Sequence, residues 1–165
     1  MKGNGILQDA RYWIEKLNLL PHPEGGFYRE TYRSTESLPN RARSLSTAIY
    51  YLLTKDTFSA LHRLASDEVF HFYLGDPVSM LQLRSDGTGK VITLGPDIMA
   101  GQSPQVVVPA GVWQGSWLES GSFALLGTTM APGFDFADYE AGNRAELTQL
   151  HPEFLGLIAR LTASK

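Results

Sequence analysis

Residues 61–75 read LHRLASDEVFHFYLG, and this stretch decides the fold because it predicts two strands joined by a short turn. A two-residue alternation puts His62 on one face of the first strand and puts Glu68, Phe70 and Phe72 together on one face of the second. If both faces line one interior, His62 and Glu68 look into the same cavity among aromatic side chains. We therefore expect a closed β structure with a polar site inside it.

Short extended runs continue on both sides of this stretch. They are rich in Val, Ile, Tyr, Phe, Trp and Thr, and Pro, Gly and Asp separate them. The predicted strands are 27–33, 45–53, 58–64, 68–74, 78–83, 91–94, 105–108, 113–118 and 123–130. No helical period interrupts them, so they predict a mainly β fold, an antiparallel sandwich or barrel over about residues 26–130.

Helices flank the predicted barrel. Residues 9–18 place apolar side chains on one helical face, with Asp9 available as the N-cap, and residues 152–162 do the same after Pro152. Residues 21–26, PHPEGG, form a shaped turn between the first helix and the first strand. No repeat or linker divides the chain, so we predict one domain over residues 1–165.

Composition excludes several classes of protein. The net charge is −3 and no block of Lys or Arg exists, which argues against nucleic-acid binding. The absence of cysteine excludes disulfides and thiolate metal sites. The first residues lack the apolar core of a signal peptide, and no apolar run is long enough to cross a bilayer. We expect a cytoplasmic protein without nucleic-acid or membrane partners.

Further polar residues fall in apolar strands. Gln82 and Gln114 are candidates to join His62 and Glu68 in the cavity. Trp117 follows the turn at residues 109–111 and is a candidate for the cavity entrance. In a regular strand, however, Gln114 and Trp117 face opposite sides, and only a bulge near residue 115 would bring both inward.

The remaining histidines and the aromatic residues have simpler explanations. His71 points away from His62 in phase, towards the opposite sheet or a partner chain. His22 and His151 lie in loops beside prolines, and we interpret both as structural. Most of the aromatic residues near the predicted cavity are explained equally well as barrel core.

Several motifs together resemble those of a known family. Residues 62–75, HRLASDEVFHFYLG, resemble the first cupin motif, a His-x-His pair followed by Glu and then Gly. Residues 108–114, VPAGVWQ, resemble the second, Pro-x-Gly followed by His. With PHPEGGFYRETYRS (21–34) and GTTMAPGFDFADYE (127–140), the chain is similar to a small cupin family often labelled predicted sugar epimerases, of the RmlC-like type. The resemblance implies a jelly-roll barrel and a homodimer.

The two motifs depart from the pattern of a metal-binding cupin, which carries three His and one Glu. Leu64 stands at the second His position and Gln114 at the last one. Only His62 and Glu68 remain as good donors, and two protein ligands seldom hold a transition metal tightly. We therefore expect no metal or other cofactor, and if a divalent metal does bind, His62 and Glu68 are its ligands.

Three functions remain open. The resemblance implies a metal-free epimerase or isomerase acting on a sugar or sugar phosphate, with His62 as the base. In that hypothesis Tyr73 or Tyr28 is the acid, Glu68 or Asp135 orients the imidazole, and Arg29 binds a phosphate. The second hypothesis is a metal-dependent oxygenase or decarboxylase, with His71 as a possible extra ligand.

The third hypothesis is a binding protein without catalysis. Aromatic side chains around the predicted cavity suit stacking on a sugar ring or a flat metabolite. The candidates are Phe70, Phe72, Trp113, Trp117, Phe134 and Phe136.

Overall fold

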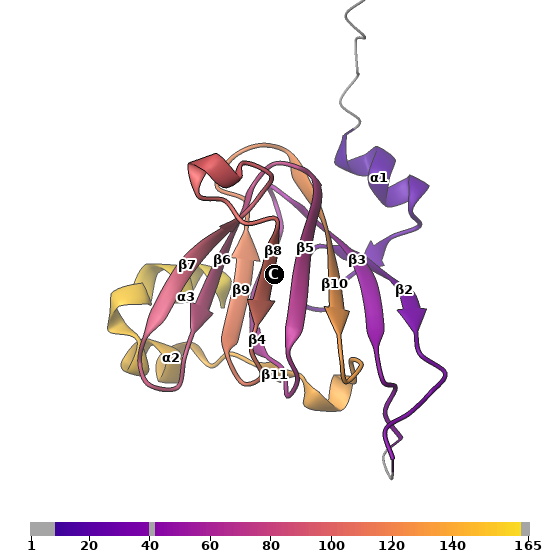
Figure 1. Cartoon of the computed structure of the whole chain (residues 1–165). Helices are drawn as coiled ribbons and strands as arrows, with labels where there is room; N and C mark the ends of the chain where they lie inside the picture. Colours follow the sequence, from indigo (N-terminus) through magenta and orange to yellow (C-terminus); the bar gives the residue numbers. More distant parts are fainter. Residues whose placement is uncertain (1–8, 40–41, 163–165) are drawn as a thin grey trace, which may run out of the picture.

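Two antiparallel sheets face each other in the computed structural model, which describes residues 9–39 and 42–162 (Figure 1). The first sheet has the order β1 (Leu20–Pro21), β2 (Phe27–Arg33), β3 (Thr47–Thr54), β10 (Phe123–Met130), β5 (Glu68–Gly75) and β8 (Gln105–Val108). The second has the order β11 (Glu140–Ala141), β4 (Phe58–Arg63), β9 (Trp113–Trp117), β6 (Val78–Leu83) and β7 (Gly89–Leu94). This arrangement is a jelly-roll barrel, which confirms the predicted mainly β fold.

Helices cover the outer faces of both sheets. They are α1 (Ala10–Lys16), α2 (Arg144–Leu150) and α3 (Leu155–Leu161), with short 3₁₀ turns η1 (Ile98–Ala100), η2 (Phe136–Asp138) and η3 (Pro152–Phe154). Figure 1 shows α1 beside β3 at one side of the barrel and α2 and α3 beside β6 and β7 at the other. Asp9 caps α1 through the backbone N–H of Tyr12, as predicted. The sequence analysis missed α2, which Asn143 caps.

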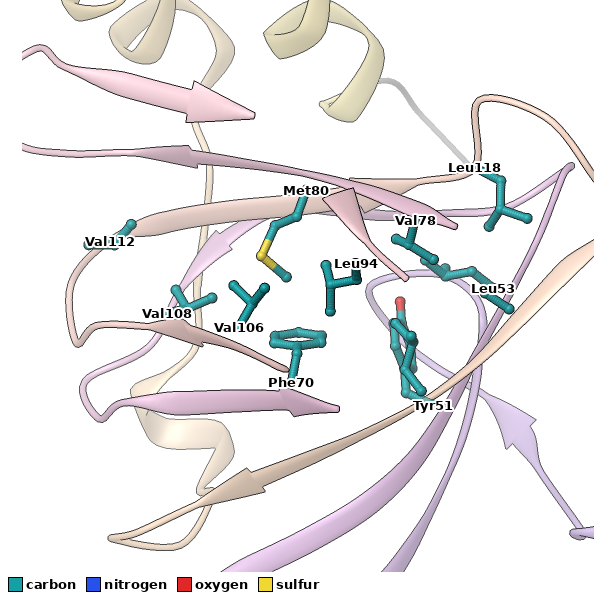
Figure 2. Close-up of a cluster of buried hydrophobic side chains, with 12 residues drawn as sticks. Tyr51, Leu53, Phe70, Val78, Met80, Leu94, Val106, Val108, Val112 and Leu118 are labelled. Carbon is teal, nitrogen blue, oxygen red and sulfur yellow. The ribbon is translucent and has the colours of Figure 1, made fainter. Parts of the chain in front are cut away.

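The interior between the sheets is divided into an apolar half and a polar half. Figure 2 shows the apolar half, where Phe70 and Val106 from the first sheet meet Met80 and Leu94 from the second. Burial of these β-branched and long apolar side chains holds the two sheets together. Towards the starts of β3 and β5 and the end of β10, polar side chains replace this core and a cavity opens.

Two strand irregularities, in β2 and β4, decide which side chains face the cavity, and a third lies where β5 pairs with β10. In β2, Glu30 pairs with Ile49 and Tyr32 with Ala48, so Thr31 is an extra residue. In β4, Ser59 pairs with Ser116 and His62 with Gln114, so two residues of β4 stand opposite Gly115. Each bulge changes the alternation and turns a second side chain of its strand inward.

The bulge that would bring both Gln114 and Trp117 inward is not present in β9. β9 pairs with β6 in unbroken register from Trp113 to Trp117, so Gln114 faces inward and Trp117 faces outward. The irregularity opposite Gly115 belongs to β4. Trp117 is 1% exposed and packs with residues of α2 and α3 on the outer face of the second sheet.

No helix within residues 9–39 and 42–162 is both long and apolar enough to span a membrane. A cytoplasmic location stays a prediction.

Candidate functional site

A cavity of about 310 Å³ occupies the polar half of the barrel interior. This volume lies at the lower end of the range of small-molecule sites in proteins. Its lining comes from β2, β3, β4, β5 and β10, from the turn before β2 and from the segment after β10. The lining residues are His22, Glu24, Tyr28, Glu30, Arg33, Thr47, Ile49, Tyr51, Ser59, His62, Leu64, Glu68, Phe70, Thr128, Met130, Phe134 and Phe136.

His62 is 3% exposed, and its ring is fixed by two polar contacts. Nδ1 lies 2.7 Å from the carbonyl oxygen of Ala60, and because a carbonyl only accepts, Nδ1 carries a proton. Nε2 lies 3.3 Å from a carboxylate oxygen of Glu24. At this distance a proton held by either partner can pass to the other. Glu24 and His62 therefore form an acid–base pair at the cavity wall.

Glu24 is supplied by the turn at residues 21–26 and not by a strand. The Ala60 N–H donates to the Glu24 carbonyl at 2.9 Å, and the Tyr51 hydroxyl donates to the Gly25 carbonyl at 2.8 Å. Gly26 adopts a φ of +71°, which a residue with a Cβ atom rarely adopts. These features fix the turn against β3 and β4 and place the Glu24 carboxylate beside His62.

Two tyrosines, Tyr139 and Tyr51, lie near the Glu24–His62 pair. Tyr139 stacks on the His62 ring with 5.5 Å between centroids and 23° between planes. Residue 141, two positions further on, pairs with His62 in the β4–β11 ladder, which fixes the position of the tyrosine. Burial and the charge of Glu24 raise the pKa of Tyr139 to about 12, so its hydroxyl keeps its proton at neutral pH. Burial, and secondarily Glu24, also raises the pKa of Tyr51.

Glu68 forms a second acidic group in the cavity. It is 7% exposed, and Gln114 donates to its carboxyl oxygen from Nε2 at 2.7 Å. Burial raises the pKa of Glu68, although the charge of His62 acts in the opposite direction. At a given pH, Glu68 is thus protonated to a greater extent than an exposed glutamate, and its protonated form can donate a proton.

Charged and aromatic residues line the rest of the cavity. Arg33 binds Glu30 with both arms of its fork, from Nε at 2.9 Å and from Nη2 at 2.7 Å. The same guanidinium lies 3.3 Å from the carbonyl of Phe134. Phe134 and Phe136 contact each other edge to face, and both line the cavity together with Tyr28.

Arg43 holds the segment that carries these phenylalanines. Its Nε donates to the Gly133 carbonyl at 2.8 Å, and its Nη1 pairs with Asp138. The bonds fasten both ends of residues 133–138 to the body of the barrel, so that this side of the cavity is pre-formed.

The structure brings part of the predicted site together. His62 and Glu68 line one cavity, and Gln114 reaches it through its bond to Glu68. Four predicted ligand-contacting aromatic residues line it as well: Tyr28, Phe70, Phe134 and Phe136.

Other predicted site residues lie elsewhere. Tyr73 is 50% exposed and stacks on His71, whose Nε2 is hydrogen-bonded to Thr129 on the outer face of the first sheet. Arg29 lies over the ring of Tyr50 on that same face. The first sheet separates these three residues from the cavity. Their positions therefore do not suit the acid role given to Tyr73, the metal-ligand role given to His71 or the phosphate contact given to Arg29.

The remaining candidates are part of the apolar packing. Phe72 packs against the core between the sheets, and Gln82 is buried with its amide bonded to the carbonyl of Val107. Trp113 packs with Trp117 under the C-terminal helices. None of these four residues lines the cavity. Asp135 uses its side chain to cap η2.

The sequence analysis missed the partner of His62. Glu24 lies in a turn whose position depends on the whole fold. In the sequence it is marked only as the one acidic residue of PHPEGG (21–26). His22 also lines the cavity, with its ring 4.5 Å from that of Tyr28, and its Nδ1 accepts from the backbone N–H of Glu24 at 3.1 Å, which agrees with the structural role predicted for it. Arg33 and Ser59 face inward because of the bulges in β2 and β4, which strict alternation does not predict.

Two positions of the cupin-like motifs offer no good donor atom to a transition metal. Leu64 offers no donor atom, and Gln114 uses its amide to donate to Glu68. No group of three or more His, Asp or Glu side chains within the described residues is arranged to hold a metal ion. Elsewhere in the cavity one Glu24 oxygen lies 3.9 Å from Nδ1 of His22 and 3.3 Å from Nε2 of His62, so the absence of a resident metal stays a prediction.

Two solved structures resemble the chain over almost its whole length. Protein SO0799 from Shewanella oneidensis is 34% identical, with a TM-score of 0.90 over 96% of this chain and 100% of that one. A hypothetical protein from Leishmania major is 31% identical, with a TM-score of 0.88 over 95% of this chain and 100% of that one. The yeast protein YML079W, described as uncharacterized, is 30% identical over 143 residues, or 76% of this chain and 71% of its own length.

A more distant likeness extends to an enzyme. Oxalate decarboxylase from Bacillus subtilis is 13% identical, with a TM-score of 0.56 over 88% of this chain and 37% of that one, which shows a common fold alone. The family described as Cupin superfamily (DUF985) matches residues 11–142, and these residues include the turn, the bulged strands and the cavity. This chain belongs to that family.

Proposed function

We propose that the cavity binds a small sugar with a carbonyl group and moves a proton on it, as an isomerase or epimerase does. The observation that carries this proposal is the Glu24–His62 pair, a buried carboxylate and imidazole 3.3 Å apart at a cavity wall. Proton transfer next to a carbonyl needs such a positioned acid–base group.

The residues divide the reaction between two sides of the cavity. The Glu24–His62 pair accepts the proton of the carbon next to the carbonyl, and Glu68 in its protonated form donates its proton to the carbonyl oxygen. The product of this step is an enediol with no net change in protons. The pair then returns its proton to the other face of the same carbon, which gives the epimer, or to the former carbonyl carbon, which gives the isomer. Glu68 takes the hydroxyl proton from the oxygen that becomes the carbonyl of the product, so that both the base and the acid are restored.

Burial supports these roles. Glu68 and His62 are almost completely shielded from water, so their charges act on a bound ligand with little screening. The bond from Gln114 fixes the Glu68 carboxyl, and the ring of Tyr139 fixes His62. Tyr28, Phe134 and Phe136 provide faces on which a sugar ring can stack.

Deuterium exchange tests the proposal directly. A panel of free aldoses and ketoses is incubated with the protein in D₂O, and loss of the proton next to the carbonyl is followed by NMR. We expect exchange on at least one sugar, and a fall of about 10²- to 10⁴-fold in Glu24→Gln and His62→Asn, the range for loss of a general acid or base.

Glu15→Gln is the matched control, because Glu15 lies on α1 in an exposed pair with Arg11. Sugars that bind in the cavity without any exchange would contradict the catalytic proposal and leave a binding protein. Unchanged exchange in the His62 variant, with its melting temperature intact, would remove His62 from the mechanism.

The homodimer also stays a proposal. The edges of both sheets, β8 in one and β7 in the other, offer backbone groups to a second chain. Sedimentation velocity tests it, since a dimer has twice the 18.2 kDa mass of one chain.

A further inference from the structure

The cavity lining contains more carboxyl groups than guanidinium groups. Three carboxyl groups, those of Glu24, Glu30 and Glu68, face it. Arg33 is the only Lys or Arg among the described residues of the lining. An anionic ligand would therefore depend on this one guanidinium for a compensating charge.

Glu30 occupies that guanidinium. Both carboxylate oxygens of Glu30 accept from Arg33, at 2.9 and 2.7 Å, in the geometry that a phosphate or carboxylate ligand would also use. The Phe134 carbonyl takes further N–H groups of Arg33 at 3.3 Å. The bulge at Thr31 makes this pairing possible at the open side of the cavity, because it turns Arg33 to the face that carries Glu30. The side chains of Arg33 and Glu30 are 46% and 39% exposed there.

We propose that Glu30 is a specificity-determining residue, which neutralises Arg33 so that the cavity accepts uncharged sugars and rejects phosphorylated or carboxylated ones. The inference rests on the proposed function in that it names the class of ligand for the same cavity. It narrows the sugar or sugar phosphate predicted from the sequence to the uncharged form.

The physical reason is a competition between acceptors. A phosphate must either displace Glu30 from Arg33 or bind without that guanidinium, and either outcome costs free energy. Sugar hydroxyls meet no such cost, because they donate to carboxylate oxygens and leave the Glu30–Arg33 pair in place.

Inorganic phosphate is the probe that tests this inference without any turnover. Binding is measured by isothermal titration at low ionic strength for the wild type, Glu30→Gln and the double variant Glu30→Gln/Arg33→Gln. We expect Glu30→Gln to bind phosphate at least about tenfold tighter than the wild type does, since a freed guanidinium forms charge-assisted bonds to phosphate. The double variant is expected to lose this gain.

Glu15→Gln is again the matched control, because it frees Arg11 from an ion pair on the surface of α1. Phosphate binding to the wild type as tight as to Glu30→Gln would overturn the inference. So would a folded Glu30→Gln variant with no gain, or a gain that the control reproduces. These titrations do not depend on deuterium exchange, so failure of the proposed catalysis and failure of this inference are separate results.

Discussion

At the scale of single residues, the chemistry of the cavity depends on the burial of its titratable side chains. His62 and Glu68 are both almost fully buried, yet each has a polar partner, Glu24 for the first and Gln114 for the second. A buried carboxyl group without full compensation favours its protonated form. The two groups are thus prepared for proton exchange before a ligand enters.

Glu68→Gln tests this state of the carboxyl group through stability. The folded-state pKa of Glu68 is raised, so its contribution to stability is complete below the ordinary pKa and is lost as the pH rises through the raised one. Glutamine imitates the protonated form and accepts the same bond from Gln114. Near neutral pH the variant should melt higher than the wild type by on the order of 2–4 °C, the shift that about 1 kcal/mol produces at this chain length.

The difference should shrink towards zero at about pH 4, near the ordinary pKa of glutamate. Scanning calorimetry across this pH range checks it, with Glu15→Gln on exposed α1 as the control. A gap between Glu68→Gln and wild type that is equal at all pH values would contradict the prediction.

Tyr139 is a positioning residue, and its ring is the part that matters. Tyr139→Phe keeps the stack on His62 and should keep deuterium exchange, whereas Tyr139→Leu removes the stack. A misplaced base should slow exchange on the order of 10- to 100-fold. Exchange rates of both variants, with side-chain ¹⁵N shifts of His62, check this; equal rates in the two variants would show that the stack is not needed.

At the scale of the elements, strand alternation predicted the barrel and the common cavity of His62 and Glu68 but not its full lining. Alternation holds in β5 from Glu68 to Phe72, and these positions were predicted correctly. It fails at the bulges of β2 and β4, which the sequence does not signal because no Gly or Pro marks either one. The inward positions of Arg33 and Ser59 follow from backbone pairing that only the folded chain defines.

Gly26→Ala tests the turn that carries Glu24. A Cβ atom at this position would lie 2.6 Å from the carbonyl oxygen of Leu52, and the φ of +71° is unfavourable for alanine. We expect a loss of about 1–3 kcal/mol in the free energy of unfolding, and loss of deuterium exchange as the turn moves.

Gly111→Ala is the matched control, since its φ is +78° but no atom lies within 4 Å of the place that a Cβ atom would take. It carries the cost of the left-handed backbone alone, about 1–2 kcal/mol, and should leave exchange intact. Urea denaturation and NMR separate the two variants. A Gly111 variant as damaging as the Gly26 variant would show that the contact with Leu52 is unimportant.

At the scale of the whole molecule, one interior serves two purposes. Its apolar half stabilises the contact between the sheets, and its polar half is a cavity. The sequence predicted the first half well, because burial of apolar residues has a period that can be read along the chain. The second half combines residues from the turn at 21–26, from five strands and from residues 133–138, and no local pattern joins segments so far apart.

Metal analysis tests the chemistry of the whole barrel. Leu64 and Gln114 stand where additional ligands would be needed, so we expect the purified protein to hold far less than one equivalent of Fe, Mn, Ni or Zn, before and after these ions are offered. Inductively coupled plasma mass spectrometry checks this. Near-stoichiometric metal that disappears in His62→Ala or Glu68→Ala would contradict the expectation and direct attention to oxygenase or decarboxylase chemistry.

The placement of Glu24 on a turn has a consequence for the redesign of such barrels. The backbone carbonyls of Glu24 and Gly25 accept from the Ala60 N–H and the Tyr51 hydroxyl, so these supports of the turn do not use the side chain at position 24. A designer could therefore replace this one side chain to reprogram the proposed reactivity of the cavity while the barrel serves unchanged as its scaffold.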